Sequence, residues 1–85
     1  MQETFALITD PTRRAILDLL AQRERTVGEL GERFTLTQPS ISRHLAALRK
    51  GGLVAVRPRG QERVYRVTPG PLRAVRDWVD ELLAD

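Results

Sequence analysis

The most constraining stretch of the sequence is residues 37–52, TQPSISRHLAALRKGG. It opens with Thr37, whose hydroxyl can cap a helix, and it closes on Gly51 and Gly52, which stop one. A narrow apolar stripe with the helical spacing i, i+4, i+7 runs between them: Ile41, Leu45 and Leu48. The pattern predicts an amphipathic helix that docks by one edge only.

The opposite side of this predicted helix is small, polar and cationic. At 100° per residue, it carries Pro39, Arg43, Ala46 and Lys50, with Ser40 and Ser42 beside them. A helix with one apolar edge and one bare polar edge can lie in a DNA groove by its bare side. The alternative is a polar side that is merely solvated.

The net charge of +3 is unevenly distributed along the chain. Residues 35–67 hold seven basic side chains and one acidic one, whereas residues 1–34 and 68–85 are both net negative. A polyanion would be drawn to the middle of the chain. Charge alone leaves a solvated cationic face as an equal alternative.

Composition excludes several classes of protein. The 85 residues suffice for one domain, and there is no cysteine for a disulfide or thiolate metal site. The single histidine, His44, and scattered acids assemble no catalytic arrangement, so we expect no enzyme and no cofactor. The N-terminus lacks a signal-peptide pattern and no apolar run could span a membrane, which predicts a cytoplasmic protein.

Three helices are predicted before residue 37. A weak pattern covers residues 2–9, and Asp10 with Pro11 then starts a helix that reaches about Gln22. Its Arg13 and Arg14 are interpreted as ordinary surface charges. A capping box at 26–29 begins a third helix of about two turns, whose apolar positions are Val27, Leu30 and Phe34. With the helix at 37–50 it forms a predicted helix-turn-helix.

The pattern changes after Gly52. Residues 53–57 and 63–67 are rich in β-branched side chains and predict a hairpin, with residues 58–62 as its turn. A last helix follows Pro69. The predicted fold is therefore one domain over residues 1–85, mainly α with a small β-hairpin, in the order α-α-α-α-β-β-α. This is a winged helix-turn-helix.

The chain resembles the ArsR-type (ArsR/SmtB-like) winged helix-turn-helix repressors over nearly its whole length. The segments that carry the resemblance are 10–17, DPTRRAIL; 26–30, TVGEL; 37–45, TQPSISRHL; 48–54, LRKGGLV; and 63–67, RVYRV. The resemblance implies a homodimeric repressor of a pseudo-palindromic operator. It places the helix 37–50 in the major groove and the hairpin, as a wing, near the minor groove.

Ten residues are the candidate DNA contacts: Thr37, Gln38, Pro39, Ser40, Ser42, Arg43, His44, Arg57, Arg59 and Arg63. The amide of Gln38 suits adenine, and Arg43 suits guanine or a phosphate. The wing-tip Arg59 suits a narrow minor groove. Ser40, Ser42, Arg57 and Arg63 suit phosphates, as does the helix N-terminus at Thr37. The family commonly has a histidine at position 44; the alternative is a partly packed side chain.

The resemblance also implies that the first and last helices form the dimer interface. Its candidate residues are Phe5, Ile8, Leu72, Val75, Trp78, Val79 and Leu82. Where the family's metal sensors have cysteines, this chain has Thr26 and Gly28, so we expect no metal site, and the effector is left unknown. The rival hypothesis is a winged-helix module for protein association without specific DNA binding.

Overall fold

The chain forms five helices and three strands, and the computed structural model describes all of residues 1–85. In chain order they are α1 (Gln2–Ile8), α2 (Pro11–Gln22), β1 (Arg25–Thr26), α3 (Val27–Gly31), α4 (Gln38–Lys50), β2 (Val54–Arg59), β3 (Glu62–Val67) and α5 (Gly70–Leu83). The predicted class, mainly helical with a hairpin wing, is confirmed. The predicted order lacked only the two-residue β1.

The helix starts follow the predicted caps. Asp10 accepts hydrogen bonds from the backbone N–H groups of Thr12 and Arg13, at 2.8 and 3.1 Å. Thr26 and Glu29 form the reciprocal capping box, each side chain accepting the other residue's N–H. Such caps satisfy N–H groups that a helix leaves without an internal partner. The sequence therefore sets where α2 and α3 begin.

The core forms where α2, α3 and α4 meet the strands. Its nine buried residues are Ile16, Leu19, Leu20, Leu30, Ile41, Leu45, Leu48, Leu53 and Val54. The three apolar residues of α4 that were predicted from their spacing are all fully buried. Burial of this single edge fixes the rotation of α4 about its axis, and the polar side is thereby turned outward.

The helix α3 is shorter than predicted. It ends at Gly31, and two tighter i→i+3 bonds follow, from Arg33 N–H to Leu30 O and from Phe34 N–H to Gly31 O. The prediction that Phe34 belongs to the helix is thus wrong, although its side chain still packs against the core. Its spacing fitted a longer helix because a tight turn keeps Phe34 on the apolar side.

The three strands form an antiparallel sheet in the order β1-β3-β2. The short β1 pairs Arg25 with Tyr65 and Thr26 with Val64. It was missed because two residues are too few to show an alternating pattern. Arg25 is buried, and its Nε donates to Leu19 O at 3.0 Å, so this charge is a fixed part of the scaffold.

The wing is longer than predicted. Its strands run to Arg59 and resume at Glu62, so the turn is only Gly60 and Gln61, and the predicted turn over residues 58–62 is wrong. Gly60 has φ of +62°, which suits the first central position of a tight hairpin turn. Pro58 suggested a loop, but β2 is an edge strand, where proline is tolerated.

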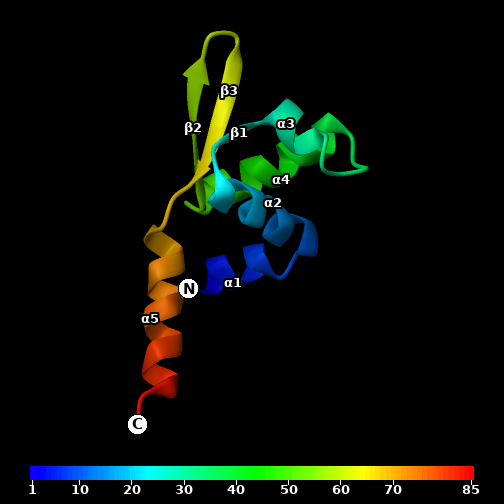
Figure 1. Cartoon of the computed structure of the whole chain (residues 1–85). Coiled ribbons are helices and arrows are strands. Elements are labelled where there is room, and N and C mark those ends of the chain that lie inside the picture. Colours follow the sequence, from blue (N-terminus) through cyan, green and yellow to red (C-terminus); the bar gives the residue numbers. More distant parts are fainter.

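The wing and α5 extend from the helical body in opposite directions (Figure 1). The molecule is accordingly elongated, with extents of 49 × 24 × 21 Å. No residue of α5 is buried, and it contacts the body through Leu72, which packs against the core, and through an edge-on contact between the rings of Phe5 and Trp78, with centroids 5.5 Å apart. The polar side of α4, which carries Arg43, Ala46 and Lys50, is exposed, and we call it the reader side.

Candidate nucleic-acid interface

The exposed side of α4 carries most of the candidate DNA contacts. Of those on this helix, Gln38, Pro39, Ser42 and Arg43 are exposed, while Ser40 and His44 are half-buried. Arg43 takes part in none of the ion pairs of the chain. Its guanidinium is therefore free to donate to a base edge or a phosphate.

The N-terminus of α4 is built to face an anion. Thr37 is the N-cap and its side-chain oxygen accepts from the N–H of Ser40 at 3.3 Å. The first-turn N–H groups and the positive end of the helix dipole lie at this exposed end. Thr37 and Gln38 are both exposed, so a phosphate can approach them directly.

His44 is bonded in a way that the sequence did not predict. Its Nδ1 accepts a hydrogen bond from Arg13 Nε at 3.3 Å, across 31 residues. The interpretation of Arg13 as an ordinary surface charge is wrong, because Arg13 is half-buried against α4. Arg14 is exposed, as expected of a surface charge, and donates to the carbonyl oxygens of Ile8 and Thr9. Local spacing could not reveal the bond between Arg13 and His44, because these residues lie on different helices, 31 positions apart.

Asp10 caps the N-terminus of α2, next to the contact between Arg13 and His44. The hydrogen bond from the Arg13 N–H is the largest influence that lowers the pKa of the Asp10 carboxyl, and the bond from the Thr12 N–H and the charge of Arg13 lower it further. The group is thus ionised at neutral pH. Asp10 thus holds the first turn of α2, and the bond from Arg13 to His44 joins this turn to the middle of α4.

The two faces of the wing differ in what they present. Residues paired across the strands share a face, so Pro58 lies beside Arg63 on the face of Val56 and Tyr65. The other face carries Arg57, Arg59 and Arg66, together with Glu62. The cations of the wing are therefore divided between its two faces, which the sequence alone does not show.

Two wing arginines are already paired with carboxylates. Arg57 forms a salt bridge with Glu24, which lies between α2 and β1, with 2.6 Å between Nη2 and Oε2. Arg59 forms one with Glu62, with 3.2 Å between Nη2 and Oε2. The hydrogen bond to Arg57 holds the pKa of Glu24 below its ordinary value, and the same bond raises the pKa of Arg57. Glu24 thus occupies, in the free protein, a position where a phosphate could bind Arg57.

Arg63 has no such partner and instead faces α4. With Arg49, from the last turn of α4, it lines a hollow of about 250 Å³ whose other residues are Val56, Arg57 and Pro58. Arg49 was not among the predicted contacts. The sequence could have indicated Arg49 as a contact, because it lies two helical turns after the candidate contact Ser42, on the same flank of α4.

We expect Glu24→Gln to strengthen DNA binding of every sequence. The substitution removes the carboxylate that holds Arg57 and also acts on Arg59 and Arg66, so more cation becomes available to phosphates. Fluorescence anisotropy with random-sequence DNA at several salt concentrations should show a higher affinity and a steeper salt dependence. Glu81→Gln on α5 is the charge-matched control, and equal effects of the two substitutions would contradict the expectation.

The candidate dimer residues gather at α1 and α5. Phe5, Ile8, Leu72 and Val75 are half-buried, whereas the exposed fractions of Trp78, Val79 and Leu82 are 39%, 37% and 63%. Ile8 and Leu72 pack against the core, and Phe5 contacts Trp78. An apolar stripe therefore continues from the helical body along α5, and its residues near the end of α5 are exposed to solvent.

Neither a metal centre nor a membrane segment is evident. No three His, Asp or Glu side chains lie together where they could hold a metal ion. None of the helices has both the length and the apolar character needed to cross a bilayer.

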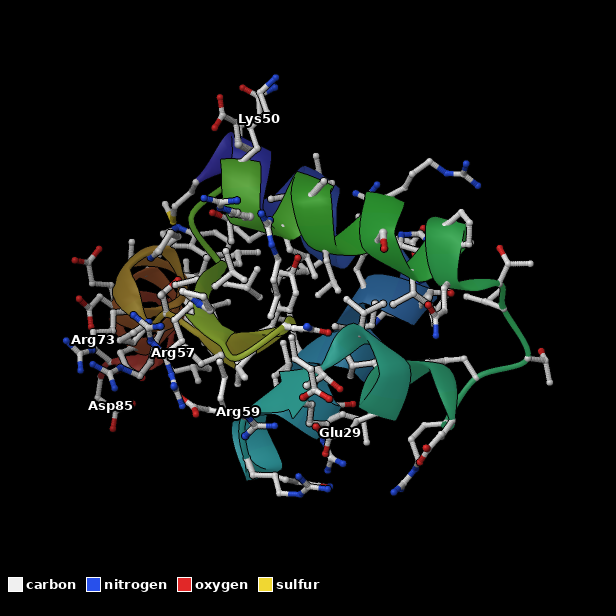
Figure 2. The ribbon with its side chains drawn as sticks, turned by 90° about the horizontal axis from the view of Figure 1, so that it is seen from above. Glu29, Lys50, Arg57, Arg59, Arg73 and Asp85 are labelled. Atoms are coloured by element: carbon white, nitrogen blue, oxygen red, sulfur yellow. The ribbon has the colours of Figure 1, made fainter.

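These features together define a winged-helix DNA-binding protein. A capped helix-turn-helix turns the bare polar side of α4 outward, and a cationic hairpin stands beside it (Figure 2). Residues 10–56, which contain the entire helix-turn-helix, match the family model "Bacterial regulatory protein, arsR family". The chain belongs to the ArsR family of DNA-binding transcriptional regulators.

Individual relatives agree with this assignment. The chain is 37% identical over 79 residues to the transcriptional repressor SdpR of Bacillus subtilis, covering 93% of this chain and 88% of SdpR. It is 41% identical over 73 residues to the regulator Rv2034 of Mycobacterium tuberculosis, covering 86% and 68%. The crystal structure of the ArsR family regulator RHA00566 superposes with a TM-score of 0.86, at 32% identity, over 96% of this chain and 84% of that one.

Proposed function

We propose that the protein is a homodimeric repressor that binds a pseudo-palindromic operator in the cytoplasm and blocks transcription by occupying it. Its own promoter is the first operator to test. The observation that carries the proposal is the exposed side of α4, where Gln38 and Arg43 project from a helix whose other edge is fully buried. These two side-chain types recognise adenine and guanine in the major groove.

The wing supports the same arrangement. Arg63 and Arg49 line the hollow between β2, β3 and α4, so phosphates beside the major groove would meet them. Arg59, near the turn, can reach a minor groove once it exchanges Glu62 for DNA. Phosphate contacts of this kind set the register of the reader helix without selecting a sequence.

The exposed apolar residues of α5 support the proposed dimer. A helix without a buried residue that carries Trp78, Val79 and Leu82 on one stripe needs a partner surface. A second copy offers the same stripe under two-fold symmetry. Such a dimer presents two α4 helices about one DNA turn apart, roughly 34 Å, which matches a palindromic site.

We expect Arg43→Ala to change which DNA sequences are preferred and Arg63→Ala to lower the affinity for all sequences. Removing Arg43 should cost about 1–3 kcal/mol at the best operator and should relax the preference at one base pair. Removing Arg63 should weaken all sequences alike and reduce the salt dependence. Competition binding with single-base operator variants distinguishes the two, and identical specificity profiles for both variants would contradict the assignment.

The decisive experiment is selection of bound sequences from a random DNA pool. Two half-sites in inverted orientation, spaced by one helical turn, should be enriched, and a gel shift on the DNA upstream of the gene then tests autoregulation. If no sequence is enriched, the protein is better described as a winged-helix module for protein association, the second candidate function.

A further inference from the structure

A second cationic site lies on the flank of α4 that faces away from the wing. We propose that Arg13 and His44, with Lys50, bind a backbone phosphate of the DNA strand opposite to the strand that the wing contacts. The proposal rests on the proposed function, since it assigns a further part of the same DNA interface. It gives Arg13, a residue of α2, a direct role in binding DNA.

The flanks of α4 are distinguished by helical geometry. At 100° per residue, Ser42 and Arg49 lie on one side of Arg43, whereas His44 and Ala47 lie on the other. The first flank meets the wing at Arg63. A helix about 10 Å across nearly fills a major groove about 12 Å wide, so each flank faces the phosphates of one strand.

The second flank meets a hollow of about 530 Å³. It lies between α1, α2 and the end of α4 and is lined by Glu3, Ala6, Leu7, Arg13, Ala47, Lys50 and Gly51. Figure 2 shows Lys50 at the end of α4, on the opposite side of the molecule from Arg57 and Arg59. The basic side chains of α4 and its neighbours thus bracket the reader side from two directions.

The cations of this hollow are free to bind an anion. Neither Arg13 nor Lys50 takes part in an ion pair of the chain. Arg13 donates its Nε–H to His44, which leaves its two terminal NH2 groups for a phosphate. Glu3 is the one acid of the lining, so the hollow retains a net positive charge.

The Arg13 bond also determines what His44 can donate. A ring nitrogen that accepts a hydrogen bond carries no proton, so neutral His44 bears its proton on Nε2. Arg13 therefore has two roles: it binds phosphate through its terminal groups and presents Nε2–H of His44 as a second donor. Arg14, one residue further along α2, cannot replace it because it is bonded to the end of α1.

The test combines protein substitutions with neutral phosphates. Methylphosphonates are placed one at a time along each strand of the selected operator, and affinities are measured for wild type, Arg13→Gln and Arg63→Gln. We expect one phosphate whose neutralisation weakens wild type about tenfold but weakens Arg13→Gln clearly less, because only His44 and Lys50 are then left to bind it. Another phosphate, on the other strand, should behave in this way for Arg63→Gln. The salt slope of Arg13→Gln should fall by about one per protomer.

Controls keep the outcome decisive. Arg76→Gln, at an exposed position of α5, makes the same change of charge. Each neutralised phosphate should weaken its binding by the same factor as it weakens that of wild type. If Arg13→Gln does not fold, Lys50→Gln at the exposed end of α4 is scanned instead. A wild type that binds its operator but shows no phosphate linked to either Arg13 or Lys50 overturns the proposal, whereas a wild type that selects no DNA removes the proposed function as well.

A measurement without DNA tests the role of His44 separately. Long-range proton–nitrogen NMR of the free protein, at a pH where the ring is neutral, should show the proton on Nε2 in wild type. Arg13→Gln should shift the population towards Nδ1–H, because the acceptor position is released. A wild-type ring protonated on Nδ1 would overturn the assigned geometry.

Discussion

Replacing Leu45 by alanine should lower the free energy of unfolding by about 2–5 kcal/mol. Leu45 is fully buried at the centre of the stripe by which α4 docks, and its neighbours in the core come from α2, α3 and the strands. Truncation removes apolar contacts and leaves a cavity that these neighbours cannot fill. In a small domain such a loss is a large share of the total stability. Urea unfolding followed by circular dichroism measures the change.

The matched control is Leu36→Ala, in the turn before α4, where the leucine is 37% exposed. Its effect should be clearly smaller, since more than a third of this side chain is already solvated and less apolar contact is lost than at the fully buried Leu45. Both variants are compared at one protein concentration, because dimerisation would couple stability to concentration. Equal losses at the two sites would mean that α4 is not held by its buried edge.

Val79→Asp should convert the proposed dimer to a monomer and lower operator affinity by about 10²–10⁴-fold. Val79 lies in the middle of the exposed stripe of α5, where a dimer would bury the introduced carboxylate without a partner. Once the protomers separate, each half-site is bound singly and the gain from linked binding is lost. Light scattering gives the mass, and anisotropy with full and half operators gives the affinities.

The fold of the protomer itself should survive this substitution, because no residue of α5 is buried in it. Arg73→Gln makes the same change of net charge at an exposed position on the opposite side of α5 and serves as the control for charge. It should remain dimeric and bind normally. A monomeric wild type, or a dimer that survives Val79→Asp, would count against α5 as the interface.

Features with a local cause could be predicted from the sequence. The start of α4 at Thr37, its end before Gly51, and its buried edge all follow from capping chemistry and helical period. The same holds for the capping box at Thr26 and Glu29. Because these signals act within a few residues, the reader helix and its exposed side could be assigned without a structure.

Features that join residues far apart in the chain could not be predicted from the sequence. The bond between Arg13 and His44 spans 31 residues, and that between Glu24 and Arg57 spans 33. Nothing in the spacing of either pair distinguishes it from ordinary solvated charges. The extent of the wing was underestimated for a different reason: Pro58 indicates a turn locally, and only the position of β2 at the sheet edge explains why it is tolerated.

The order β1-β3-β2 has a consequence for solubility. A hairpin held away from its body exposes backbone donors and acceptors on its outer strands, to which strands of other molecules can add. On one side, the two-residue β1 covers only Val64 and Tyr65 of β3, and the charged Glu62 and Arg63 form the open edge beyond it. On the other side, β2 contains Pro58 between Arg57 and Arg59. Short length, a missing amide and repelling charges each discourage such addition. The wing can therefore reach outward without becoming a template for aggregation.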